Sequence, residues 1–380
     1  MSETLHLTGF IKGVTYKPYL GEKLQEITID NFDVNKASAY GLIKSPITEI
    51  AYSKWVSPKR TRSYPFARMY NTYNSSKIIT IIPLIKDEGK DGDRDLIQYS
   101  TISWMNLLNI YIVLAYYEKA EKSNKKGQDT KNKLTNQKFN NEFVNYQIEE
   151  ILAYRQSALH WNKNLFEQRF VSIFEKALDS YDSISHKTGV LVHSREGMDK
   201  YLQKITNEFA EFKNISLKNS HNASKRESMT SHQLEYLADG LKATFSIENY
   251  LGGVYYLTAD EIFFDNDTYV IQESKNSSKD SFPKLSDIQD GLFKLILFSN
   301  LDSLKLDGKP VNFVTTLKLT GKNIVGDIIL PDATTQELEI FLAANRNNFK
   351  PKQKGIIRKL VTESENNDKI KIQISSNFAI

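Results

Sequence analysis

The sequence predicts a mixed α/β (α+β) fold, in which a mixed β-sheet is flanked by helices and preceded by a strand-rich N-terminal region. Three observations lead to this prediction. Short apolar runs alternate with polar turns before residue 120, apolar residues then follow helical spacing from Phe143 to about Leu178, and short aromatic and β-branched runs follow from Val254. Hydrophobic residues make up 40% of the 380 positions, enough for a sizeable core.

The same patterns divide the chain. The runs 78–85 and 110–117 are typical of strands, and the turn 87–95 separates them. Residues 121–142 are polar and charged, which favours a linker or long surface loop. We therefore expect an N-terminal region at 1–120, this linker, an α/β domain at 143–330, and a C-terminal extension of open role at 331–380.

The elements expected in the α/β domain follow one another as helices, a strand hairpin, a helix and a strand. Asp265, Asn266 and Asp267 are good hairpin-turn residues between two of the strand-like runs. The expected helices cover 143–178, 197–212, 231–245 and 285–301, and the expected strands cover 254–257, 261–264, 268–272 and 311–319.

Composition excludes several function classes. There are no cysteines, so disulfides, cysteine nucleophiles and zinc–thiolate sites are ruled out. No phosphate-binding glycine loop of the ATPase type occurs. The longest apolar stretch, 104–117, is shorter than the roughly 20 residues of a membrane span. No secretion signal is visible at the N-terminus, so we expect a soluble, cytoplasmic protein with no membrane partner.

Acidic and basic side chains gather at the end of the expected hairpin. Glu273 and Lys275 are two residues apart and therefore share one face of a strand. Asp260 lies 13 residues before Glu273, and a hairpin around residues 265–267 brings it back beside Glu273. Two carboxylates and a lysine at one sheet edge suit phosphodiester hydrolysis, since carboxylates hold Mg²⁺ and a lysine can orient water or counter developing charge. An exposed cross-strand ion pair is the simpler alternative for a Glu-x-Lys pattern.

The segment LTADEIFFDNDTYVIQESKNSS, residues 257–278, resembles the active-site hairpin of the PD-(D/E)xK nuclease superfamily. The resemblance covers about residues 230–320 and implies a restriction-endonuclease-like fold. It implies that Asp260 and Glu273 bind Mg²⁺ together with the backbone carbonyl of Ser274, and that Lys275 is the catalytic lysine. Ala259 stands where the family has proline.

Two points about the acidic residues stay open. Glu261, rather than Asp260, directly precedes the apolar run and is the alternative first ligand. Members of the family often add an acidic residue from an upstream helix, and either Glu235 or Glu248 could take that part.

Two segments of the N-terminal region carry further charge. Residues 54–73 interleave basic and aromatic side chains, a combination that can neutralise phosphates and stack on bases, with Lys54, Lys59, Arg60, Arg62 and Arg68 as the expected DNA contacts. The run 87–95 is rich in Asp, which leaves a competing carboxylate site as an alternative to a solvated turn.

From the resemblance we expect a Mg²⁺-dependent endodeoxyribonuclease, specifically a prokaryotic type II restriction endonuclease that cuts double-stranded DNA at a defined sequence. A homodimer and a cognate DNA methyltransferase in the same system are further implications. The rival functions are a non-specific or repair nuclease of the same fold, a DNA-binding protein without catalysis, and an interaction protein with a chance Glu-x-Lys.

Overall fold

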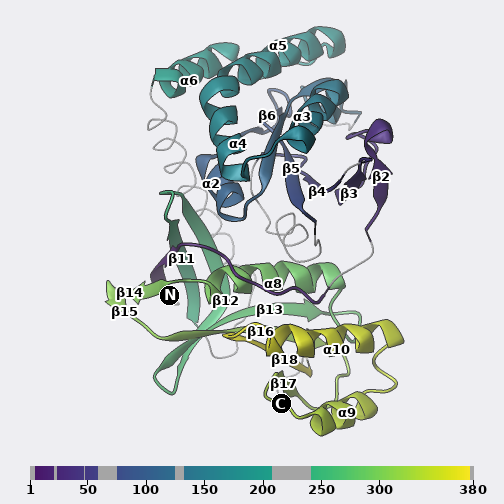
Figure 1. The fold of residues 1–380 in the computed structure, drawn as a ribbon, viewed down its shortest axis with the longest axis vertical. Coiled ribbons are helices and arrows are strands. Elements are labelled where there is room, and N and C mark those ends of the chain that lie inside the picture. Colours follow the sequence, from purple (N-terminus) through teal and green to yellow (C-terminus); the bar gives the residue numbers. More distant parts are fainter. Residues whose placement is uncertain are drawn as a thin grey trace. The chain divides into compact units, whose positions relative to one another are not determined.

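In a computed structural model, the described residues, which are 5–20, 24–46, 48–58, 75–124, 132–207 and 241–376, form two units (Figure 1). One unit contains residues 5–20 and 241–376, and the other contains the described residues between 24 and 207. The second unit is thus inserted between the first strand of the chain and the rest of the first unit's sheet. This division differs from the boundaries at 120, 142 and 330 that the sequence pattern suggested.

The first unit is built on a nine-stranded mixed sheet of order β15-β14-β1-β11-β12-β13-β16-β18-β17. Strands β11, β12 and β13 form an antiparallel meander, and β16 then pairs parallel with β13. The strands are β1 (Leu5–Ile11), β11 (Leu241–Asn249), β12 (Val254–Asp265), β13 (Thr268–Ser277), β14 (Ser303–Leu306), β15 (Lys309–Pro310), β16 (Phe313–Gly321), β17 (Ile328–Leu330) and β18 (Ile370–Ser376).

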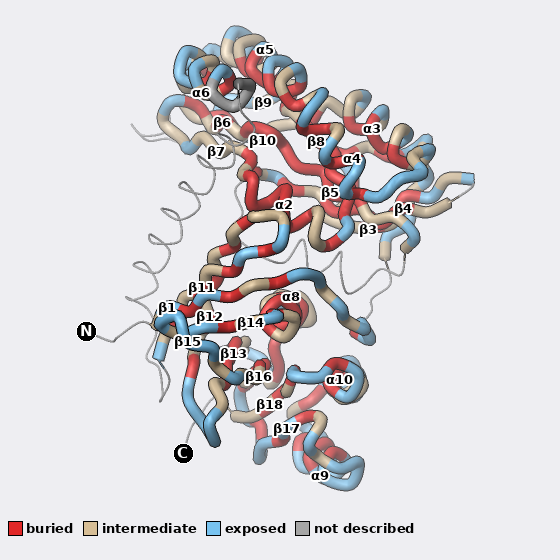
Figure 2. The backbone as a smooth tube through the Cα atoms, turned by 60° about the vertical axis from the view of Figure 1, so that its left-hand side comes forward, coloured by how far each residue is buried: buried red, intermediate tan, exposed pale blue. Residues whose placement is uncertain are grey.

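Helix α8 (Leu285–Ser299) follows β13, which is the position that its apolar spacing predicted. Most of its side chains are buried, and Figure 2 shows the helix as one of the most deeply covered elements of this unit. Because β13 and β16 are parallel, a crossover is required between them. It consists of α8, which buries its apolar surface on the sheet, and of the antiparallel pair β14 and β15 at the far edge of the sheet. Helices α9 (Thr335–Ala344) and α10 (Pro351–Glu365) pack on β17 at the opposite edge from β15.

The C-terminal residues 331–380 were expected as an extension, but β18 lies inside the sheet, between β16 and β17. Its alternating Ile370, Ile372 and Ile374 are buried and explain why the strand is internal. The described part of this segment therefore completes the sheet.

The second unit contains a five-stranded sheet of order β2-β3-β4-β5-β8. All five residues of β8 and the last five of β5 are buried, which agrees with the apolar character of both strands (Figure 2). The strands are β2 (Glu26–Thr28), β3 (Tyr40–Lys44), β4 (Glu49–Lys54), β5 (Lys77–Pro83) and β8 (Tyr111–Ala115). The helices are α2 (Tyr99–Leu107), α3 (Asn141–Ala153), α4 (Ala158–Asn164), α5 (Phe170–Thr188) and α6 (Arg195–Asn207). A short 3₁₀ turn covers Ile29–Asn31, and a π-helical turn at Leu165–Arg169 lies between α4 and α5.

Residues 121–142 were expected as a linker or long surface loop. Their described parts, 121–124 and 132–142, contain the end of one strand and the whole of another, which form a small two-stranded sheet. Strands β9 (Tyr117–Lys122) and β10 (Leu134–Phe139) pair antiparallel, and α3 begins directly after them. A second ribbon joins β6 (Ile85–Asp87) to β7 (Arg94–Leu96). The helices at 141–188, assigned from the sequence to the α/β domain, belong to this second unit.

Candidate active site

The hairpin of β12 and β13 turns where the sequence predicted. Asp265 pairs with Thr268, which leaves a loop of Asn266 and Asp267. Both loop residues have positive φ, 45° and 59°. That conformation is the one that Asn and Asp tolerate best after Gly, and it matches the twist of the flanking strands.

A β-bulge lies in β12 at the predicted acidic residues. Leu241 pairs with Ile262 and Ala243 with Ala259, so Asp260 and Glu261 together oppose a single residue of β11. A bulge redirects a side chain that regular alternation would send elsewhere. Adjacent residues of a strand already point to opposite faces, and the extra residue of the bulge changes which face each of the two carboxylates takes.

Asp260 and Glu261 have different partners. The Oδ2 atom of Asp260 accepts a hydrogen bond of 2.8 Å from the backbone N–H of Ser274. The carboxylate of Glu261 accepts a hydrogen bond from the side-chain amide of Gln272. Only the first contact reaches the Glu-x-Lys segment, so the geometry favours Asp260 over Glu261 as the companion of Glu273.

Glu273 is the centre of a buried ion cluster. Its side chain is 1% exposed, and Lys275 Nζ lies 2.9 Å from its Oε1. A second lysine, Lys294 of α8, lies 2.8 Å from Oε1 and 2.9 Å from Oε2 and also donates to the carbonyl of Thr258. The exposed ion pair that the sequence left open is therefore not observed. The carboxylate of Glu273 is buried and is paired with one lysine from β13 and one from α8.

Burial and charge act in opposite directions on this cluster. Burial raises the pKa of Glu273, and the two ammonium groups oppose that rise. Burial by itself would lower the pKa of Lys275 and of Lys294, but the carboxylate of Glu273 outweighs it and both pKa values are raised. Both lysines therefore remain protonated at neutral pH.

Helix α8 supplies three residues that the sequence analysis missed. Lys294 contacts Glu273, Asp290 Oδ2 lies 3.3 Å from Lys275 Nζ, and the amide of Gln289 is 1% exposed with no hydrogen-bond partner among the described residues. Lys294 interrupts the run LFKLILF, and a lone lysine in a buried apolar helix was the available signal.

Gly291 of α8 has no side chain, and the stem of Lys275 lies in the space that a side chain there would need. A Cβ at this position would lie 2.7 Å from Leu317 Cδ1 and 3.1 Å from Lys275 Cε. The absence of a side chain therefore lets α8 approach the sheet and leaves the lysine stem in place. Gly355 is a useful contrast, since it also lies inside a helix but a Cβ there would have no neighbouring atom within 4 Å.

We expect Gly291→Ala to lower the free energy of unfolding by about 1 kcal/mol, because overpacking outweighs the gain in helix propensity. Gly355→Ala should raise it by about 0.5–1 kcal/mol, since only the propensity changes. Urea denaturation of both variants measures the difference, and a shift of the same sign in both would contradict the packing argument.

The remaining acidic residues named from the sequence do not join the cluster within the described structure. Glu248 is exposed and lies opposite Val254 in the pairing of β11 with β12. Val254 is six residues from Asp260 along β12, so Glu248 and Asp260 are roughly 20 Å apart along the strand. Glu235 and residues 231–240 of the helix expected over 231–245 lie outside the described residues, and residues 241–245 of that expected helix begin strand β11 instead. The Ser274 carbonyl stays a predicted ligand.

Of the basic residues expected to contact DNA, the structure describes Lys54. Its Nζ donates to the carbonyls of Val34 and Ala37, at 2.7 and 2.6 Å. Lys59, Arg60, Arg62 and Arg68 lie outside the described residues, so their part in DNA binding stays a prediction.

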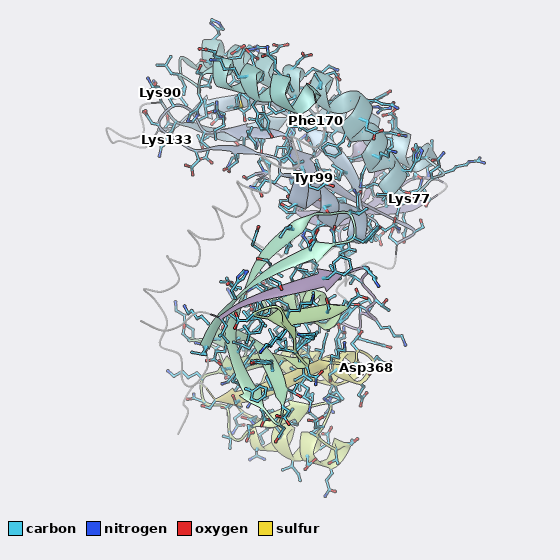
Figure 3. All side chains as sticks on the ribbon, turned by 90° about the vertical axis from the view of Figure 1, so that its left-hand side faces the viewer. Lys77, Lys90, Tyr99, Lys133, Phe170 and Asp368 are labelled. Atoms are coloured by element: carbon cyan, nitrogen blue, oxygen red, sulfur yellow. The ribbon has the colours of Figure 1, made fainter. Side chains whose placement is uncertain are left out.

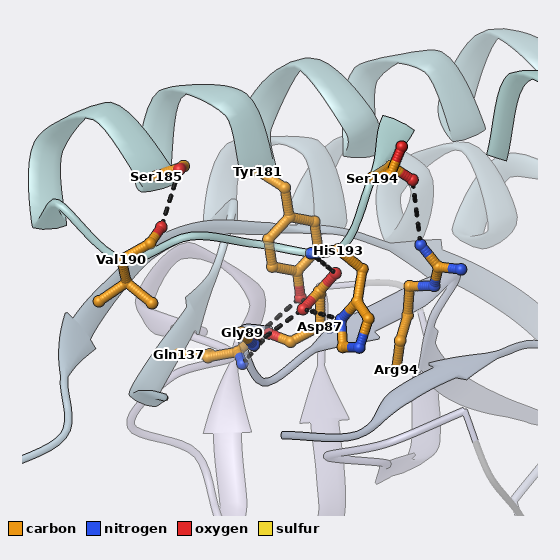
Figure 4. A network of polar contacts seen from close by, with 9 residues as sticks. All are labelled: Asp87, Gly89, Arg94, Gln137, Tyr181, Ser185, Val190, His193 and Ser194. Carbon is orange, nitrogen blue, oxygen red and sulfur yellow. Dashed lines mark hydrogen bonds and ion pairs between the residues drawn. The ribbon is translucent and has the colours of Figure 1, made fainter. Parts of the chain in front are cut away.

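The acidic run 87–95 forms the ribbon of β6 and β7, and its carboxylates are used within the fold. Asp87 is 3% exposed, and its Oδ1 accepts from Gly89 N and lies 2.9 Å from His193 Nδ1 (Figure 4). Asp91 accepts from Asn132 N, and Asp95 from the hydroxyl of Ser57. These contacts favour a structural turn over the competing carboxylate site.

In the part of the chain that the structure describes, no helix is long and apolar enough to cross a membrane. Over the same residues, no group of three or more histidine, aspartate or glutamate side chains could hold a metal ion. Comparison with models of protein families, with curated proteins and with solved structures found no match in any of the three.

Proposed function

We propose that this chain is a Mg²⁺-dependent endodeoxyribonuclease, and specifically a type II restriction endonuclease. The observation that carries the proposal is the convergence of Asp260, Glu273 and Lys275 at one place on β12 and β13. An antiparallel meander, then α8, and then a strand β16 that pairs parallel with β13 agree with what the resemblance to PD-(D/E)xK nucleases implies; the short strands β14 and β15 stand between α8 and β16. A restriction-endonuclease-like fold for this unit is part of the proposal.

The two carboxylates fit a magnesium ion. Mg²⁺ in enzymes is usually held by one or two carboxylates, with waters and substrate phosphate completing its shell, so a third acidic side chain is not required. Asp260 and Glu273 would hold it, with the Ser274 carbonyl as a further oxygen. When bound there, the ion would lower the pKa of a coordinated water and offset charge on the scissile phosphate.

The lysines have distinct tasks in this proposal. Glu273 and Asp290 favour the charged form of Lys275, which suits it to stabilise the negative charge that develops on the phosphate oxygens and to orient the attacking water. Lys294 reaches Glu273 from α8 and fixes the carboxylate's orientation, and it keeps the buried charge compensated. In the proposed reaction the attacking water gives a proton to solvent as its oxygen bonds to phosphorus. The bond from phosphorus to the leaving sugar oxygen breaks, and that oxygen takes up a proton from solvent.

Digestion of unmethylated plasmid and phage DNAs by the purified protein tests the proposal. Discrete fragments in Mg²⁺ that disappear in EDTA are the expected result. A smear would favour a non-specific or repair nuclease, and DNA binding without cutting would favour a protein that has lost catalysis.

The adjacent acids provide a matched pair of variants. Asp260→Asn should slow cleavage about 10²-fold, because a metal ligand is weakened while the shape is kept. Glu261→Gln should stay within a few-fold of wild type. The reverse order would show that the bulge directs Glu261, not Asp260, to the metal.

Recognition of duplex DNA, a two-fold homodimer with one site for each strand, and a protecting methyltransferase in the same system are parts of this proposal. Size measurement by light scattering, with and without a cleavable duplex, tests the dimer.

A further inference from the structure

A polar cavity of about 580 Å³ lies in the second unit, beside the ribbon of β9 and β10. Its walls come from β4, β6, β9 and β10 and the segments next to them, all within this unit. Drug- and nucleotide-sized ligands occupy pockets of about 300–1,000 Å³. The cavity is therefore large enough for a small organic molecule.

Positive charge dominates the lining. Four lysines and one acidic residue face the cavity, and the acid, Glu88, is paired with Lys86 at 2.6 Å. The other three lining lysines are Lys54, Lys133 and Lys138. Neither Lys133, labelled in Figure 3, nor Lys138 has an ion-pair partner among the residues that the structure describes.

Lys54 lines this cavity, and two hydrogen bonds fix the position of its ammonium group. Its ammonium group uses two of its three hydrogens on the carbonyls of Val34 and Ala37, which leaves one for a ligand. Burial lowers the pKa of Lys54, and the nearby Lys138 lowers it further, although Asp33 acts against both. Like charges in one pocket are costly unless an anion offsets them.

We propose that this cavity binds the phosphate group of a small nucleotide-sized molecule through Lys54, Lys133 and Lys138. Lysines that converge as separate point charges suit an anion with several equivalent oxygens, and phosphate is such an anion. The apolar wall formed by Val56, Leu134 and Phe139 would accept the organic part. The site lies in the other unit from Asp260 and Glu273, and the proposal does not depend on nuclease activity.

Calorimetric titration of the full-length protein with ATP, without metal ions, tests the proposal, and adenosine serves as the probe that lacks phosphate. ATP should bind and adenosine should not. The double variant Lys133→Ala/Lys138→Ala should weaken ATP binding about 100-fold, or about 10-fold for each charge-assisted hydrogen bond.

The matched control is Lys119→Ala/Lys163→Ala, which removes the same charge from exposed positions in the same unit. Lys119 pairs with Lys138 across the ribbon but does not line the cavity, so the control also reports on the ribbon's stability. The control should bind ATP as wild type does, and thermal melts should show both variants folded.

Two results would overturn the proposal. One is ATP binding that the double variant leaves unchanged. The other is no binding of ATP at millimolar concentration. Weaker binding of a duplex oligonucleotide to the double variant alone would then assign these lysines to DNA phosphates instead.

Discussion

Replacing Lys275 with Met is expected to slow DNA cleavage about 10³-fold while the protein stays folded. The methionine keeps most of the buried stem but removes the ammonium group that lies 2.9 Å from Glu273 and 3.3 Å from Asp290. Glu273 keeps Lys294 as its partner, so its charge is still compensated. Single-turnover cleavage of a plasmid under Mg²⁺ measures the rate directly.

Lys305→Met is the control for this variant, because Lys305 is an exposed lysine on β14 of the same unit. It should cut DNA at the wild-type rate. Equal rates for Lys275→Met and wild type would remove Lys275 from the mechanism, even if the protein proves to be a nuclease. A loss of DNA binding in Lys275→Met would instead assign the residue to substrate affinity.

Replacing Glu363 with Ala is expected to lower the free energy of unfolding of the first unit by about 3 kcal/mol. The carboxylate of this α10 residue is buried and accepts three hydrogen bonds from the N-terminal segment. The donors are Tyr16 Oη at 2.7 Å, Tyr19 N at 2.5 Å and Leu20 N at 3.0 Å. Removing the acceptor leaves backbone N–H groups without a partner, and denaturant unfolding measures the cost.

Glu363→Gln separates hydrogen bonding from charge. The amide oxygen can accept from both backbone N–H groups, and the amide nitrogen can donate to Tyr16 Oη, so this variant should lose about 1 kcal/mol or less. A loss in Glu363→Gln as large as in Glu363→Ala would show that the charge, and not the acceptor geometry, holds the segment.

Wild type and Glu363→Gln should also differ in pH dependence. Burial raises the pKa of Glu363 above its usual value of 4.5, so the folded state binds this proton more tightly than the unfolded state. The resulting stabilisation is fully present below pH 4.5 and is lost as the pH rises through the raised pKa. Relative to Glu363→Gln, wild type should therefore become less stable as the pH rises above 4.5.

The local elements of the site were predictable because local chemistry determines them. Asp265 to Asp267 specify the hairpin turn, and alternation along β13 places Glu273 and Lys275 on one face. The apolar spacing of residues 285–301 predicts α8 to within two residues. The convergence of Asp260 on the Glu-x-Lys segment follows from the hairpin, although the bulge at Asp260 and Glu261 does not appear in any sequence pattern.

The parts that the sequence did not reveal depend on distant residues. Lys294 points toward Glu273 because of the way α8 is rotated about its axis where it packs on the sheet. The hydrophobic periodicity of the sequence does not determine this rotation. The position of β18 between β16 and β17 depends on pairing between residues about 50 positions apart. The composition of β10 resembles that of a loop because only Leu134 and Phe139 of that strand are buried. Single-sequence patterns carry little information about such pairings.

The parallel pairing of β1 with β11 has a consequence for how the protein is made. His6 contacts Thr244 across 238 positions of the chain, and β1 lies inside the sheet, between β14 and β11. At ribosomal speeds of about 5–20 residues per second, the first strand would wait roughly 10–50 s for its partner. The inserted unit, whose described residues all lie between the two strands, can be completed in that interval. Synthesis therefore provides a natural order of folding, in which the first unit closes last around a strand that emerged first.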